Sequence, residues 1–105
     1  MEELIFGIIS HGGTARGLAY EAFEAALEGD FDKAEELMKE AEEEIGQAHK
    51  LQTSTLQREA SGEKFDVGVI FVHAQDHLMT AMAEKSLLKQ MIEMQKRIAK
   101  LEGTL

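Results

Sequence analysis

The chain has 105 residues and a formal net charge of −9, with 44% apolar residues, 30% charged residues, no proline and no cysteine. This length suits one compact domain, and a chain without proline and with few aromatic residues favours an all-α fold. The negative charge argues against binding to nucleic acid or to an anionic membrane, and the lack of cysteine excludes disulfides and thiolate-held metals.

The first predicted element is a helix from Glu2 to Glu28. Its apolar residues recur three and four positions apart, as expected for a helix with one buried stripe. That stripe consists of Leu4, Ile8, Ala15, Ala19, Ala22 and Ala26. Gly12-Gly13 weakens the helix by about 1 kcal/mol per glycine relative to alanine. Small residues would also let another backbone come close, so we expect the helix to continue through them.

The chain start carries no predicted targeting segment. Met1-Glu2-Glu3 is acidic rather than basic, and the apolar run that follows extends only from Leu4 to Ile9. This run is neither a signal peptide nor a membrane span. We therefore expect a cytoplasmic protein that does not insert into the membrane.

Gly29-Asp30 predicts the first break, because glycine suits the left-handed position after a helix and aspartate caps the next one. The second helix is predicted from Phe31 to Ala60. Its expected buried stripe is Phe31, Ala34, Met38, Ala41, Ile45 and Ala48. The acidic cluster on its other side is interpreted as a solvated helix face, with a docking patch as the alternative.

Ser61 to Lys64 predicts the second break, and a third helix is predicted from Phe65 to Lys100. Its opening, Val67 to Val72, is β-branched enough to resemble a strand, but the helical pattern continues without a stop. Three long helices with short connections predict a single domain, residues 1–105, folded as an antiparallel up-down-up three-helix bundle.

The third helix has two unlike halves. After Lys85 it is amphipathic, and the residues expected inside are Leu88, Met91, Ile92 and Ile98. Before Lys85 nearly every residue is apolar, and two partner helices cannot cover all sides of such a helix. We therefore expect a homo-oligomer packed around this half. The alternative is a partly exposed, methionine-rich docking surface.

A polar island interrupts that apolar half. His73, Asp76, His77 and Thr80 lie on one helical face, because residues three and four apart stack on a helix. A neutral histidine can attack phosphorus through a free ring nitrogen, and donors such as Gln75, His77 or Thr80 could stabilise the added charge. Two histidines four apart could instead hold a metal, although Ala74 replaces the glutamate of the zinc-protease pattern. The residues alone leave phosphoryl chemistry, a metal site and a structural polar cluster open.

Asp76 raises a separate question. If an oligomer axis brought several copies together, their like charges would oppose ionisation and association. A bound hard cation with oxygen ligands would relieve that repulsion.

The sequence resembles the lactose/cellobiose-class enzyme IIA family of the sugar phosphotransferase system in five motifs along almost the whole chain. The most specific is Val72-His73-Ala74-Gln75-Asp76-His77-Leu78-Met79-Thr80. The others are Gly13-Thr14-Ala15-Arg16, Gly29-Asp30-Phe31, Ala48-His49-Lys50-Leu51-Gln52-Thr53 and Glu59-Ala60-Ser61-Gly62-Glu63. Their order and spacing make the resemblance strong.

The resemblance implies a homotrimer in which His73 accepts a phosphoryl group on Nε2 from the carrier protein HPr. His73 would then donate that group to the cognate enzyme IIB during uptake of a disaccharide of the cellobiose, chitobiose or lactose type. Asp76 matches the metal position, where three copies would share a divalent cation, usually Mg²⁺. Gln75 and His77 are expected to line the site between subunits, whereas His11 and His49 receive no role.

Two other classes of function are compatible with these residues. One is a non-catalytic metal-binding helical assembly that uses His73, Asp76 and His77. The other is a regulatory interaction module.

Overall fold

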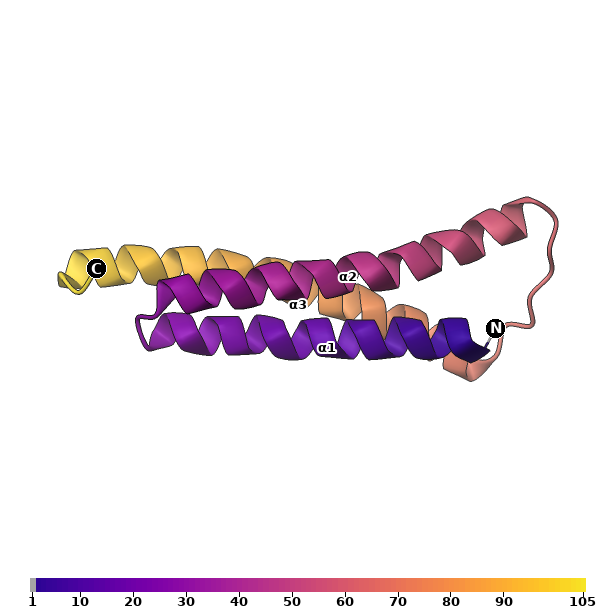
Figure 1. Ribbon diagram of the computed structural model, residues 1–105, viewed down its shortest axis with the longest axis horizontal. Coiled ribbons are helices and arrows are strands. Elements are labelled where there is room, and N and C mark those ends of the chain that lie inside the picture. Colours follow the sequence, from indigo (N-terminus) through magenta and orange to yellow (C-terminus); the bar gives the residue numbers. More distant parts are fainter. Residues whose placement is uncertain (1) are drawn as a thin grey trace.

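A computed structural model of the chain describes residues 2–105, which form three helices and no strand. They are α1 (Glu2–Leu27), α2 (Phe31–Ala60) and α3 (Val69–Glu102). Figure 1 shows α1 and α3 running in one direction and α2 in the other, which confirms the predicted up-down-up bundle. The molecule is a rod of 58 × 19 × 18 Å.

The turn between α1 and α2 follows its sequence signals. Gly29 adopts a left-handed φ of +86°, which a side chain would strain, and closes α1. The Asp30 carboxylate then accepts a hydrogen bond of 3.1 Å from the Lys33 backbone N–H and so caps α2. Local side-chain chemistry therefore sets this boundary, and the predicted bounds of α2 are confirmed.

The predicted start of the third helix was wrong by four residues, because α3 begins at Val69. Gly68 is its N-cap, in an extended conformation that disfavours continuation of the helix toward Phe65. The preceding segment has other partners. The Arg58 guanidinium forms hydrogen bonds of 2.8 and 2.7 Å with Glu63 and lies 5.1 Å from the centre of the Phe65 ring.

Alanines of α1 allow the helices to pack closely. Four alanines of the predicted α1 stripe are fully buried: Ala15, Ala19, Ala22 and Ala26. Gly12 is buried too, and α1 passes through Gly12-Gly13 without a break, as expected. α1 packs along both other helices, whereas α2 and α3 meet over a much shorter stretch. In Figure 1 the C-terminal part of α2 diverges from α3.

Apolar side chains remain exposed along α3. We call the following set the apolar face of α3: Val69, Val72, Met79, Leu87, Met94 and Leu101, all at least 48% exposed. Met91 and Ile98 were predicted to lie inside but are 41% and 45% exposed, whereas Leu88 and Ile92 are buried as expected. The error arose because a helical period locates apolar residues without showing whether they face the protomer's own helices or another surface.

Along residues 2–105, no helix combines the length and the apolar composition that crossing a membrane would require.

Candidate functional site

The predicted polar island lies on the second and third turns of α3. Ala74 and Leu78 fix this part of the helix, because both are fully buried in a cluster with Ile5 and Ile8 of α1 and Ala48 of α2. His73 directly precedes Ala74, on the outer side of the helix, and is exposed. An imidazole in this position is accessible to a macromolecular partner.

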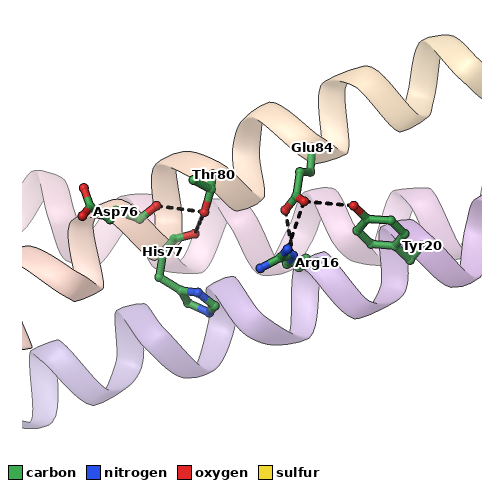
Figure 2. Close-up of polar contacts among 6 residues, drawn as sticks. All are labelled: Arg16, Tyr20, Asp76, His77, Thr80 and Glu84. Carbon is green, nitrogen blue, oxygen red and sulfur yellow. Dashed lines mark hydrogen bonds and ion pairs between the residues drawn. The ribbon is translucent and has the colours of Figure 1, made fainter.

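The two histidines of the island form a pair. The rings of His73 and His77 are stacked, with their centres 5.9 Å apart and an angle of 26° between their planes. His77 is half-buried, and its side chain points toward α1 in Figure 2. The prediction that residues four apart would share a face is therefore confirmed for these two rings.

Asp76 lies within the apolar face of α3, between Val72 and Met79 in the chain. Leu87 and Met94 follow it by close to three and five helical turns, so the three side chains leave the helix in nearly the same direction. Asp76 is exposed, and its carboxylate points away from the His77 ring in Figure 2. An exposed carboxylate inside an apolar face can meet a partner surface without contacting its own histidines.

Gln75 lies on the other flank of α3. Its side-chain oxygen accepts a hydrogen bond from the Gln52 side chain of α2. The side-chain N–H groups of Gln75 take no part in this hydrogen bond. The expected lining residues therefore separate: His77 lies beside His73, whereas Gln75 faces α2.

The Thr80 hydroxyl, one of the possible donors to an added phosphoryl group, has partners within its own helix. Its hydroxyl lies 2.9 Å from the backbone oxygen of Asp76 and 3.1 Å from that of His77. This hydroxyl therefore donates back into the helix, a common use of threonine within helices.

An interhelical cluster beyond the histidines was not predicted. In Figure 2 the Glu84 carboxylate meets the Arg16 guanidinium, with a shortest distance of 2.7 Å, and accepts a hydrogen bond of 2.9 Å from the Tyr20 hydroxyl. This hydrogen bond, with burial and the negative charge of Glu84, raises the pKa of Tyr20 above its ordinary value. The only sequence signal was Arg16 in the Gly13-Thr14-Ala15-Arg16 motif, because Glu84 is distant in the chain.

The histidines without an assigned role lie elsewhere. Nδ1 of His11 is 2.5 Å from the Glu44 carboxylate and links α1 to α2. His49 is exposed on α2. In the part of the chain that the structure describes, no three His, Asp or Glu side chains gather closely enough to hold a metal ion.

A family model described as "PTS system, Lactose/Cellobiose specific IIA subunit" matches residues 3–96 of the chain. The lichenan-specific phosphotransferase enzyme IIA component of Bacillus subtilis is 45% identical over 103 residues, which cover 98% of this chain and 94% of the relative.

Two solved structures extend the similarity to the fold. The cellobiose-specific enzyme IIA of Bacillus anthracis has a TM-score of 0.92 and 40% identity, covering 94% of this chain and 91% of that structure. The IIA(chitobiose) chain of the Escherichia coli IIA–HPr complex has a TM-score of 0.77 and 36% identity, covering 92% and 94%.

Proposed function

Because the chain belongs to the lactose/cellobiose-specific IIA subunit family of the sugar phosphotransferase system, we propose that it is a phosphohistidine carrier and that His73 carries the phosphoryl group. The observation on which this proposal depends is an exposed imidazole on a rigid helix, stacked on a second histidine. A carrier must meet one protein to receive the group and another to release it, so an exposed ring suits the task.

The transfer needs little from this chain beyond a positioned nucleophile. The lone pair on Nε2 of neutral His73 attacks phosphorus, the N–P bond forms, and the bond from phosphorus to the donor protein breaks. The proton on Nδ1 stays in place during the attack. The product carries up to about two negative charges, which nearby donors must stabilise. His77 is suited to this role because its ring is adjacent to that of His73.

The proposed donor is HPr, which accompanies the IIA chain in the similar E. coli complex. The proposed acceptor is the cognate enzyme IIB, and the phosphoryl group would end on an imported disaccharide of the cellobiose, chitobiose or lactose type. We place the carrier in the cytoplasm, where phosphoenolpyruvate is the source of the phosphoryl group that HPr carries.

We propose that the protomers assemble as a homotrimer through the apolar face of α3. Six large side chains that are at least 48% exposed form a row on one side of a single helix, an arrangement typical of an interface between copies. Gln75 supports this assembly, since it lies on the flank of α3 opposite to His77. Its free amide donors could then serve the histidine of a neighbouring copy.

Asp76 suits a shared divalent cation at the trimer axis, with Mg²⁺ as the proposed ion. Asp76 supplies one carboxylate with hard oxygen donors per protomer, within the face proposed to assemble. The bound ion would offset the repulsion among three carboxylates, so Asp76 is an assembly residue in this proposal.

The alternative metal-binding assembly requires His73, Asp76 and His77 to converge. Against it, the Asp76 carboxylate and the His77 ring point in different directions from α3 in Figure 2. No observation in the structure favours the regulatory module over the carrier.

Phosphorylation on His73 is tested by incubating the protein with phosphoenolpyruvate, enzyme I and HPr. We expect an acid-labile, alkali-stable phosphate on the parent protein and none on His73→Ala. His49→Ala, which removes an exposed histidine from α2, is the matched control and should be labelled like the parent. Labelling that survived in His73→Ala would contradict the proposal.

A further inference from the structure

The middle of α1 contains two consecutive glycines where the carrier function gives no evident reason for them. Gly12 and Gly13 lie inside a helix of 26 residues, and alanine stabilises a helix interior better than glycine does. Both glycines have ordinary helical backbone, since the positive-φ glycines are Gly29, Gly62 and Gly103. Their presence is therefore not explained by backbone conformation.

The space beside these glycines is occupied by the His77 ring. A β-carbon added at Gly13 would lie 3.3 Å from Nε2 of His77, and one added at Gly12 would lie 3.4 Å from its Cδ2. Ordinary contacts between such atoms are about 3.5–4.0 Å. An alanine at position 13 would therefore push the ring away from α1 by a few tenths of an ångström, whereas one at position 12 would lie at the lower edge of ordinary contact.

A shift of the His77 ring changes its contact with His73, because the two rings stack on one flank of α3. The helix itself cannot follow the ring, since Ala74 and Leu78 hold it in the core. A displacement at Gly13 is therefore transmitted through the side chains of the histidine pair.

We propose that the Gly12-Gly13 pair of α1 is a positioning element for phosphoryl transfer: by omitting two β-carbons, it seats His77 where its ring stacks on His73 and orients that nucleophile. This inference rests on the proposed carrier function. The role falls on a motif of α1 that the proposed transfer does not otherwise use.

The chain offers a matched control in the same helix. Gly17 has nothing within 4 Å of its would-be β-carbon and is exposed. Gly13→Ala and Gly17→Ala therefore make the same chemical change, with the same gain in helix propensity, and differ in the contact with His77.

The test measures phosphorylation of each variant by phospho-HPr at saturating and limiting donor, together with the melting temperature. For Gly13→Ala we expect a kcat about three- to tenfold lower, the range that a ring forced off its preferred rotamer implies. The KM should stay within twofold of that of the parent. The melting temperature should equal or exceed that of the parent. The imidazole NMR signals of His73 should move in Gly13→Ala and stay in place in Gly17→Ala.

A double-mutant cycle separates positioning from a general effect on α1. If Gly13 acts through His77, adding Gly13→Ala to His77→Ala should lower kcat no further. Full additivity, or equal kcat for Gly13→Ala and Gly17→Ala, would overturn the inference while leaving the carrier function intact. If the parent protein itself took up no phosphate, the carrier proposal would fail instead.

Discussion

Leu87→Ala tests the proposed assembly through the apolar face of α3. Leu87 is 64% exposed in the protomer and lies close to three turns beyond Asp76. Burying a whole leucine side chain contributes about 1.5–3 kcal/mol, so the exposed part of Leu87 can contribute about 1–2 kcal/mol when another copy covers it. Alanine keeps part of that surface, and we expect a loss of about 1 kcal/mol per protomer.

Three protomers would together lose about 3 kcal/mol, which weakens the trimer association constant by about two orders of magnitude. Sedimentation velocity over a concentration series measures this shift. Leu27→Ala is the matched control, because Leu27 is 55% exposed but lies at the end of α1, away from the apolar face of α3. Equal association constants for the two variants would refute the assignment of this face to the interface.

Three further predictions concern the metal, the α2 cap and the α1–α3 cluster. Chelation should dissociate the parent assembly but leave Asp76→Leu assembled, because leucine removes the like charges that the cation offsets. Sedimentation measures both, and a variant as sensitive to chelator as the parent would argue against a shared ion. Asp30→Ala should lower the free energy of unfolding in urea by about 1 kcal/mol through loss of the cap. The control Asp32→Ala, at an exposed residue, should lower it less, and equal losses would contradict the capping role. Tyr20 is the single tyrosine, so alkaline absorbance titration reports its pKa directly. Glu84→Gln should lower that pKa, because the Glu84 carboxylate accepts a hydrogen bond from the phenol hydroxyl and repels the phenolate. An unchanged midpoint would contradict this cause.

Helix boundaries were predictable where the signal was local. Gly29 and Asp30 act on the residues beside them, and the predicted bounds of α2 agree with the structure. The start of α3 was not predictable in the same way. Its delay to Val69 accompanies contacts of Arg58 with Glu63 and Phe65, which helical periodicity does not reveal.

For the candidate site, the sequence predicted only the features that depend on residue spacing within α3. The spacing of His73 and His77 is sufficient to place the rings together. Contacts made by the flanks of α3 with other helices needed the fold: Gln75 with Gln52, Glu84 with Arg16, and His77 beside the glycines of α1. The exposure of Met91 also escaped prediction, because a period does not identify the surface that an apolar side chain meets.

The most direct measurement of the central claim is the ¹⁵N NMR spectrum of the protein after phosphorylation by phospho-HPr, with its imidazole nitrogens assigned. The account predicts one phosphohistidine, with the phosphoryl group on Nε2 of His73 and the rings of His11, His49 and His77 unmodified. A phosphoryl group on any other ring, or an unmodified His73 in phosphorylated protein, would contradict it.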